Sequence, residues 1–438
     1  MRSRGDAFRC LLPLVWKADA IASANRWFLI EKGMYVTTTQ DDLRQRVVSV
    51  IDENADAIVS LSKYIHANPE IAMQEFKSSK ACADMLEHFG FDVTREIADI
   101  PTAFSATAGS TGPLIAYLSE YDALPGLGHG CGHNLIAIAG VAAGLGLKAA
   151  IDRGLPGRVA VLGTPAEEAV GGKVLMANAG VFADVQAALG AHPGTPDATC
   201  PTVEGSGQAL ACMLVRFEYH GQAAHAAGDP WNGRNALDAV ILLFNGINAL
   251  RQHVKSDARL HGIITHGGMA PNVIPDYAAA EFFVRAGTMT YMNQLAERVR
   301  EIAEGAAAIT GTRLEFSTPE EPNSDMITNH VMARALKKNL DSVGLVLQDA
   351  KPEPGMGSTD WGNVSYVTPS VEIGYPIVDR MITWHSTDVV AASDSEMGYQ
   401  NTLLVAKALA MTGIDLIEQP ELLAEVRSSW KTEVERRT

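Results

Sequence analysis

The sequence predicts an α/β protein with a mostly parallel sheet flanked by helices and a smaller, inserted ferredoxin-like α+β domain. Short apolar runs alternate with helical stretches along the first half of the chain, which is typical of a parallel sheet with helices on its faces. A segment of about 110 residues then follows the order β-α-β-β-α-β before helix–strand alternation resumes after Asn323.

The chain is expected to begin with helices. Apolar residues recur at helical spacing from residue 41 to 68, and Pro69 should end this helix. A second helix is expected at 75–88. Residues 1–34 are expected to form an N-terminal extension without a fixed fold. They hold basic residues and a short apolar stretch but no clear cleavage site, which argues against a secretory signal. Translation could also begin at Met34, which would make the preceding stretch an artefact.

Three apolar runs should form buried strands of the sheet, at 114–118, 158–163 and 185–190. Helices at 134–151 and 172–179 should connect them. Polar residues follow each strand, and ligands of such sheets bind beyond the carboxyl ends of the strands, so we expect the polar loops to meet there.

The inserted domain is read from alternating apolar residues and helical stretches. Met213, Val215, Phe217 and Tyr219 alternate along a half-exposed strand. The remaining elements are a helix at 235–249, strands at 262–266 and 277–285, a helix at 292–308 and a strand at 312–318. The expected divisions are 35–205 and 321–438 for the larger domain and 206–320 for the inserted one.

Composition excludes several kinds of partner. The formal net charge is −16 and no Lys/Arg run occurs, which argues against binding to nucleic acid or to an anionic membrane. No apolar run reaches the roughly 18 residues that a membrane span needs. The five cysteines are scattered, which favours a reducing compartment, and we expect the cytoplasm.

Four strand-end loops offer side chains that bind metal ions. Cys131 and His133 lie in a glycine-rich bend, and thiolate and imidazole are good ligands for zinc and similar ions. Alone, this pair is equally well explained by a buried cysteine beside a structural histidine. Glu168, His192 and His385 follow other strands. The neighbouring carboxylates of 167 and 168 should point in different directions, so that one can bind metal and the other hold a water.

These residues lie in motifs that resemble a zinc-peptidase family, the one that contains aminoacylase, carboxypeptidase G and succinyl-diaminopimelate desuccinylase. Its amidohydrolase branch, with p-aminobenzoyl-glutamate hydrolase, the auxin-conjugate hydrolases and the Xaa-Arg/β-alanyl-lysine dipeptidases, is the most similar. The resemblance covers residues 64–408. Its motifs are HANPE (66–70), DALP (122–125), CGHN (131–134), PAEE (165–168), GQAAHA (221–226), NVIP (272–275), GSTDWGNVS (357–365) and HS (385–386).

The resemblance implies a zinc-exopeptidase-like catalytic domain with two divalent metal ions per subunit, Zn or Mn, with Co or Ni as alternatives. Cys131 would bridge the ions. Glu168 and His385 would hold one ion, and His133 and His192 the other. The resemblance also implies that Asp122 orients a ligand and that Glu167 is the general base.

Three departures from the family pattern leave the metal count and the substrate open. Many relatives outside this branch have a histidine ligand where this chain has Glu120. The branch often has aspartate at the position of Asn134, and Thr387 replaces an aromatic residue after the last motif.

The inserted domain and the chain after it hold candidate substrate contacts. The resemblance implies that His225 reaches the active site of a partner subunit and polarises the scissile carbonyl, and that Asn272 and Arg285 bind a substrate carboxylate or carbonyl. Asn272 could instead be a turn residue before Pro275, and Arg285 a surface strand residue. Three further candidates could equally form a helix N-cap; they are Ser358, Thr359 and Asp360.

The expected function is hydrolysis of an amide C–N bond in a small N-acyl amino acid, dipeptide or aryl-amide, by a metal-bound hydroxide with a glutamate base. One alternative is hydrolytic deamination of an activated aromatic amine by the same hydroxide. Another is a catalytically inactive binding protein on the same scaffold. The expected partners are a small-molecule substrate and further copies of the chain, in a homodimer or a higher oligomer built from dimers.

Overall fold

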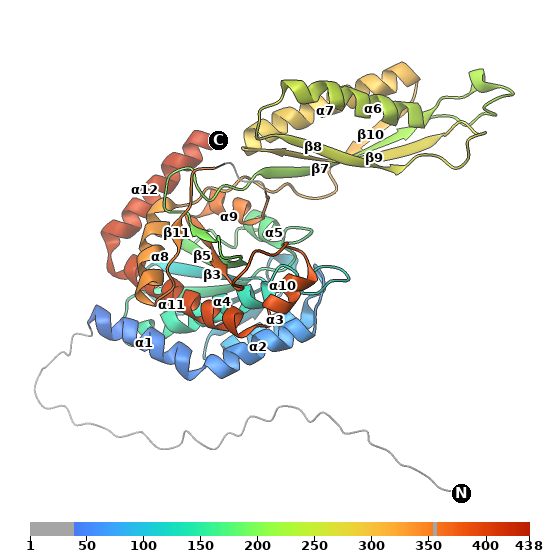
Figure 1. Cartoon of the computed structure of the whole chain (residues 1–438). Helices are drawn as coiled ribbons and strands as arrows, with labels where there is room; N and C mark the ends of the chain where they lie inside the picture. Colours follow the sequence, from blue (N-terminus) through green and yellow to red (C-terminus); the bar gives the residue numbers. More distant parts are fainter. Residues whose placement is uncertain (1–38, 354–356) are drawn as a thin grey trace, which may run out of the picture. The chain divides into compact units, whose positions relative to one another are not determined.

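The computed structural model describes residues 39–353 and 357–438 (Figure 1). The predicted N-terminal extension and Met34 lie outside the described residues.

The larger domain is built on a six-stranded sheet of order β1-β2-β4-β3-β5-β12. Strands β4, β3, β5 and β12 are parallel, while β2 pairs antiparallel with β4 and β1 antiparallel with β2. The prediction of a mostly parallel sheet is confirmed. The strands are β1 Asp92–Arg95, β2 Phe104–Ala108, β3 Leu114–Ser119, β4 Arg158–Gly163, β5 Val185–Gly194 and β12 Ser370–Pro376.

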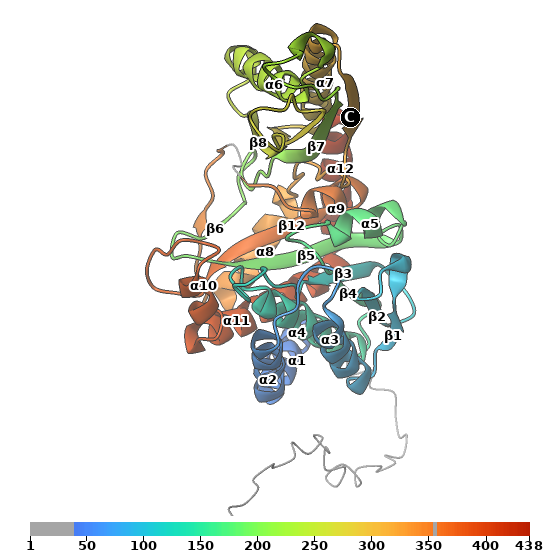
Figure 2. The same ribbon diagram turned by 90° about the vertical axis from the view of Figure 1, so that its right-hand side faces the viewer.

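Helices cover both faces of this sheet, with α1 to α4 on one face and α5 and α9 on the other (Figure 2). Successive β3 residues show the division, because Tyr117 belongs to the core under α4 whereas Leu118 packs with Trp361 of α9. The helices are α1 Gln40–Glu53, α2 Ala55–Ala67, α3 Phe76–His88, α4 His133–Ile151, α5 Gly172–Asn178 and α9 Trp361–Val367.

The single helix expected at 41–68 is wrong, because the chain breaks at Asn54 into α1 and α2. Asn54 leaves the helical backbone conformation (φ −111°, ψ 9°), and its side-chain amide donates to Val50 O at 2.8 Å. Asparagine side chains compete with helical hydrogen bonds in this way, and the apolar spacing does not register the interruption.

Helix α4 is long and apolar enough, by length and composition alone, to cross a membrane. The sequence reading missed this, since it found no run of sufficient length. In the structure 89% of the most apolar window is buried inside the fold, where α4 packs on α1, α2 and α11. Its apolar character is therefore that of a core helix.

The inserted domain is a four-stranded antiparallel sheet of order β10-β7-β9-β8, with α6 and α7 on one face (Figure 1). It has a hydrophobic core of its own, in which Phe217 and Phe282 pack with Leu243 and Val299. The β-α-β-β-α-β order agrees with the ferredoxin-like prediction. The elements are β7 Ala211–His220, α6 Ala236–Leu250, β8 Arg259–His266, β9 Tyr277–Ala286, α7 Met289–Thr310 and β10 Arg313–Ser317.

The rest of the described chain completes the larger domain. Strand β11 Gln348–Asp349 pairs in parallel with β6 Thr199–Cys200. The remaining helices are α8 His330–Ser342, α10 Thr387–Ala392, α11 Glu396–Glu418 and α12 Pro420–Arg437, with short 3-10 turns at Ile97–Asp99, Pro230–Asn232 and Arg251–His253.

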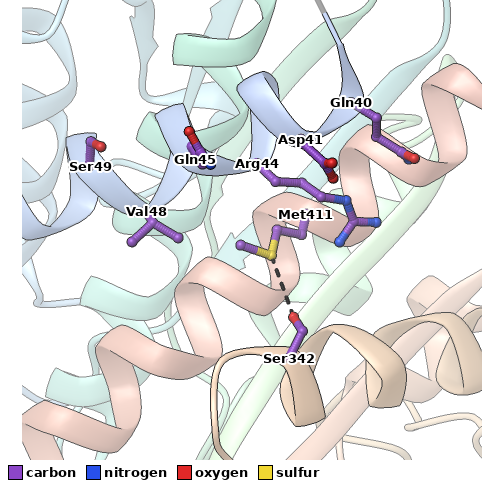
Figure 3. A pocket seen from close by; sticks show the side chains of 8 residues that line it. All are labelled: Gln40, Asp41, Arg44, Gln45, Val48, Ser49, Ser342 and Met411. Carbon is purple, nitrogen blue, oxygen red and sulfur yellow. Dashed lines mark hydrogen bonds between the residues drawn. The ribbon is translucent and has the colours of Figure 1, made fainter.

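A wide hollow of about 810 Å³ lies between α1, α8 and α11 (Figure 3). The guanidinium of Arg44 lies there, already paired with Asp415 and donating to Asn339 Oδ1 at 2.7 Å. None of the candidate catalytic or metal-binding residues lines this hollow, so its size does not make it the active site.

Candidate metal centre and active site

The five predicted metal ligands come together at the carboxyl ends of the parallel strands. These side chains, with Glu167, form three groups, and within each group the possible ligand atoms lie within 4.8 Å of one another. The groups are Cys131 with His133 and His192, Cys131 with Glu168 and His385, and His133 with Glu167 and Glu168. Cys131 belongs to two of these groups, as a bridging ligand would.

The donor atoms face one another, and only some of them form hydrogen bonds. Cys131 Sγ lies 3.4 Å from His192 Nε2, and His385 Nε2 lies 3.2 Å from Glu168 Oε1. Within the described part of the chain, His133 Nε2 and Glu168 Oε1 are buried and have no hydrogen-bond partner. A buried polar atom without a partner costs about 1–3 kcal/mol, and a bound cation would remove this cost. The residues therefore fit a divalent metal.

The chemistry of the donor set agrees with this fit. Burial raises the pKa of the Cys131 thiol to about 12, so that a thiolate at this position needs a nearby cation. A coordinated metal ion supplies that charge and deprotonates the thiol. Sulfur, imidazole and carboxylate together suit Zn and similar ions.

Two contacts orient the histidines that are predicted to bind metal. His133 Nδ1 lies 2.8 Å from Asp122 Oδ1, and the other oxygen of Asp122 accepts from Glu168 N at 3.0 Å. His192 Nδ1 lies 2.7 Å from Pro193 O, and since a carbonyl only accepts, Nδ1 carries the proton and Nε2 is left for a cation.

Trp384 also contacts the site, because its Nε1 donates to Cys131 Sγ at 3.3 Å. Sequence reasoning did not single out this tryptophan. The next residue, His385, has a φ of +57°, a left-handed conformation that a side chain other than glycine adopts at some cost. The loop after β12 therefore holds its ligand in a strained backbone.

Glu167 has the surroundings of a general base. Burial, and then the charges of Asp360 and Glu120, raise the pKa of its carboxyl well above the usual range. Its side chain is 14% exposed, and Oε2 lies 4.0 Å from His133 Nε2. A base with a raised pKa, open to a small molecule and beside the metal ligands, matches the predicted role.

The charges that act on Glu167 belong to a fully buried ion-pair network. Lys173 Nζ contacts Glu120 Oε1 at 2.9 Å and Asp360 Oδ1 at 2.6 Å, and Trp361 Nε1 also donates to Glu120 at 2.9 Å. Glu120, which stands where many relatives have a histidine, is thus held by Lys173 and Trp361. Sequence reasoning missed Lys173, whose only signal is its place after Gly171-Gly172 at the start of α5.

Asp360 is one of the three substrate candidates before α9, and its carboxylate is already paired with Lys173 in this network. Ser358 Oγ accepts from Arg285 Nη1 at 3.0 Å, which joins two predicted substrate contacts from the two domains. Thr359 Oγ1 accepts from Trp361 N at 3.3 Å at the start of α9. The N-cap residue of α9 is Asp360, whose side chain makes no capping hydrogen bond to the helix.

His225 and Asn272 lie together in exposed loops of the inserted domain, where Ala226 N donates to Asn272 O at 3.1 Å. His225 Nδ1 accepts from the backbone amides of Ala227 at 3.2 Å and Gly228 at 3.1 Å. Because Nδ1 is an acceptor, neutral His225 carries its proton on Nε2.

Asn134 serves the packing of α4. Its side-chain amide donates to Ser62 Oγ and to Ser393 O, both at 2.9 Å. Asn134, one of the departures from the family pattern, therefore links α4 to α2 and to the end of α10. Its side-chain amide donates to none of the predicted metal ligands among the described residues.

Comparisons with known proteins agree with this geometry. Peptidase family M20/M25/M40 matches residues 116–396. The Xaa-Arg dipeptidase of Mus musculus is 36% identical over 92% of this chain and 96% of its own length. One of the p-aminobenzoyl-glutamate hydrolase chains of Escherichia coli K12 is 31% identical over 87% of this chain and 94% of its own.

Solved structures show the same fold. An aminobenzoyl-glutamate utilization protein from Klebsiella pneumoniae has a TM-score of 0.64 at 20% identity, covering 83% of this chain and 97% of that one. A Bacillus subtilis protein described as a dinuclear metal-binding peptidase of the M20 family has a TM-score of 0.56 at 22% identity, covering 81% and 98%. Matched along most of its length and carrying clustered side chains that could hold a metal ion, the chain belongs to peptidase family M20/M25/M40 and is a metal-dependent hydrolase of amide C–N bonds.

Proposed function

We propose that this enzyme cleaves a dipeptide or a small N-acyl amino acid, with an aryl-amide as the third substrate class. The observation that carries the proposal is the cluster of Cys131, His133, Glu168, His192 and His385 around buried donor atoms that lack partners, with Glu167 beside it. The similarity to a protein named Xaa-Arg dipeptidase, over 92% of this chain, makes dipeptides the first class to examine.

The proposed site holds two divalent ions, Zn or Mn, with Co or Ni as alternatives. Cys131 would be shared between them, with Glu168 and His385 on one side and His133 and His192 on the other. The chemistry that such ions supply when bound is a lowered pKa for a water and a polarised scissile carbonyl. Asp122 keeps His133 in the orientation and tautomer that binding needs.

Glu167 moves the proton in this proposal. Its carboxylate accepts the proton of the attacking water and then returns it to the leaving nitrogen, so that no net proton is consumed in breaking the C–N bond. The raised pKa makes the carboxylate a better proton acceptor than an exposed glutamate.

The substrate contacts come from the inserted domain and from the segment before α9. Arg285 and Ser358, already in contact, would bind the substrate carboxylate together with Asn272 and Thr359. The partner subunit's His225 would donate from Nε2–H to the oxygen on which negative charge develops. This role requires a homodimer or an oligomer of dimers, with residues 206–320 as the dimerisation domain and 35–205 and 321–438 as the catalytic domain. We propose a cytoplasmic location for it.

Product analysis tests the proposal. Purified enzyme is supplied with Zn²⁺, Mn²⁺ or Co²⁺ and a panel of dipeptides, N-acyl amino acids and aminobenzoates. The expected products are a free carboxylate and a free amine in equal amounts. Release of ammonia together with a phenol would show deamination instead, and no turnover across the panel would favour a binding protein.

A further inference from the structure

We infer that Glu75, a buried glutamate at the start of α3, is a positioning residue that holds the loop of the general base. This inference rests on the proposed role of Glu167. Glu75 is fully buried, which is rare for a glutamate. It lies about ninety positions before Glu167 in the sequence, in a segment that contributes none of the predicted metal ligands.

The contact is made through the backbone of the residue before the base. Glu75 Oε1 accepts from Ala166 N at 2.9 Å and from Met73 N at 3.0 Å, while Oε2 accepts from Thr102 Oγ1 at 2.9 Å. The hydroxyl of Tyr121 in turn donates to Thr102 O at 2.5 Å. The carboxyl group thus ties the start of α3 and the segment of Thr102 to the loop after β4, and Tyr121 supports the segment of Thr102 through its carbonyl.

Ala166 needs such a tie because its backbone is strained. Its φ is +62°, in the left-handed region that a residue with a Cβ adopts at a cost on the order of 1–3 kcal/mol and keeps only when its surroundings enforce it. A second carboxylate holds the other end of the loop, where Glu168 N donates to Asp122 Oδ2 at 3.0 Å. Glu167 lies between these two anchors.

The two anchors have separable effects. Asp122 orients Glu168 and His133, which are metal ligands, whereas Glu75 acts on Ala166 and thereby on Glu167. Loss of Glu75 should let Ala166 relax to an ordinary conformation and move the base, while the metal ligands keep their own support. The expected signature is a lower kcat with unchanged metal content and unchanged KM.

The test compares Glu75→Ala with Glu75→Gln. Glutamine keeps an oxygen for the amides of Met73 and Ala166 and offers its NH₂ to Thr102 Oγ1, so it should retain kcat within about threefold of wild type. Alanine removes the acceptor, and kcat should fall about 10–100-fold, part of the 10²–10⁴-fold that a positioned base contributes. Metal per chain is measured by elemental analysis, and folding by thermal unfolding.

A suppressor distinguishes positioning from a general loss of stability. Glycine adopts a φ of +62° without strain, so Ala166→Gly added to Glu75→Ala should recover several-fold in kcat. The matched control is Glu70→Ala, because Glu70 also accepts backbone amides near α3, from Lys77 and Ser78, both at 2.9 Å. This control should lower the unfolding temperature and leave kcat unchanged.

The inference is overturned if folded, metal-loaded Glu75→Ala keeps wild-type kcat, or if its loss of kcat comes with an equal loss of metal. Should the alanine variant not fold, Glu75→Asp takes its place, since a carboxylate one methylene shorter cannot reach Ala166 N and should show the same loss. Glu167→Gln separates the two proposals. If Glu167→Gln keeps wild-type kcat, Glu167 is not the base and Glu75 has no base to position. If Glu167→Gln is inactive while Glu75→Ala keeps wild-type kcat, the role of Glu167 stands and only the role of Glu75 fails.

Discussion

Glu167 and Glu168 are adjacent in sequence, but their carboxylates have different neighbours. Glu168 Oε1 lies 3.2 Å from His385 Nε2 and has no hydrogen-bond partner among the described residues. The pKa of the Glu167 carboxyl is instead raised by burial and by the charge of Asp360, which pairs with Lys173. At the scale of single residues, this difference supports the proposal that Glu168 binds metal and Glu167 transfers the proton.

Replacing each of the two carboxylates tests this assignment. Glu167→Gln should keep its metal and lose about 10²–10⁴-fold in kcat, because a positioned base is worth that much. Glu168→Gln should instead lower metal occupancy, since an amide is a weaker ligand than a carboxylate. Elemental analysis and steady-state kinetics on both variants measure the two effects. If the variants exchanged behaviour, the roles of the two residues would be reversed.

The pH dependence of stability should carry a contribution from Glu75. Burial raises the pKa of this carboxyl to about 7 in the folded chain, against about 4.3 for an unfolded chain. The folded state therefore binds more protons between these values, and its stability falls as pH rises through this window. Glutamine does not titrate. Glu75→Gln should therefore gain stability relative to wild type between pH 5 and pH 8, by on the order of 1–3 kcal/mol.

Denaturant unfolding of both proteins at the two pH values measures this difference, and other titrating groups cancel in the comparison. A glutamine variant that loses stability relative to wild type as pH rises would show that Glu75 is ionised and stabilised by its hydrogen bonds, which is the opposite of the expected sign.

The cluster of candidate metal ligands could be predicted from the sequence because thiol, imidazole and carboxylate side chains recur in separate loops that follow strands, within motifs that resemble one family. Glu75, Lys173 and Trp384 could not. Their partners Ala166, Glu120 and Cys131 are brought to them by the packing of distant segments, and no local spacing records that proximity. The same holds for Glu120. Its position could be compared with the histidine of many relatives, but no local pattern indicates that Lys173 pairs with it.

At the scale of elements, the start of α5 packs closely against the loop that carries Glu167. A Cβ on Gly172 would lie 1.9 Å from Pro165 O, so Gly172→Ala must displace the segment that carries Glu167. We expect a loss of at least tenfold in kcat and about 1–3 kcal/mol in stability. Kinetics and denaturant unfolding check the two effects.

Gly305→Ala in α7 is the matched control, because this helical glycine is exposed and a Cβ there meets nothing within 4 Å. It should stabilise the protein by roughly 0.5–1 kcal/mol with unchanged kcat. Wild-type activity in Gly172→Ala would mean that the loop can yield without moving the base.

Strands β3, β4 and β5 were predictable from their continuous apolar runs, and the two helices of the inserted domain from their helical spacing. The antiparallel pair β1 and β2 was not predicted. β1 has only four residues, none of them buried, so its alternation is too short to be read, and its place in the sheet depends on β2. The break at Asn54 was missed because a side-chain hydrogen bond, and not a change in apolar spacing, ends α1.

At the scale of the whole molecule, the proposed active site needs a second subunit. His225 is exposed, its Nδ1 is fixed by two backbone amides, and its Nε2–H is available to a group outside its own loop. His225→Ala should lower kcat about 10²–10³-fold, the usual effect of losing a donor to an oxyanion.

Mixing variants tests whether that donor acts across subunits. Inactive His225→Ala and inactive Glu167→Gln, combined under conditions that allow subunit exchange, should form heterodimers with one complete site and recover activity. Differently tagged chains recovered together prove the exchange. A mixture that exchanges subunits and stays inactive would place His225 outside the partner's active site.

Metal dependence is the central claim, and titration of metal back into stripped enzyme tests it most directly. The buried donor atoms without partners, His133 Nε2 and Glu168 Oε1, predict that chelation abolishes turnover. Turnover should return as Zn²⁺ or Mn²⁺ is added, and should reach its full value as elemental analysis approaches two ions per chain. Full turnover in protein that elemental analysis shows to be free of metal would contradict the account.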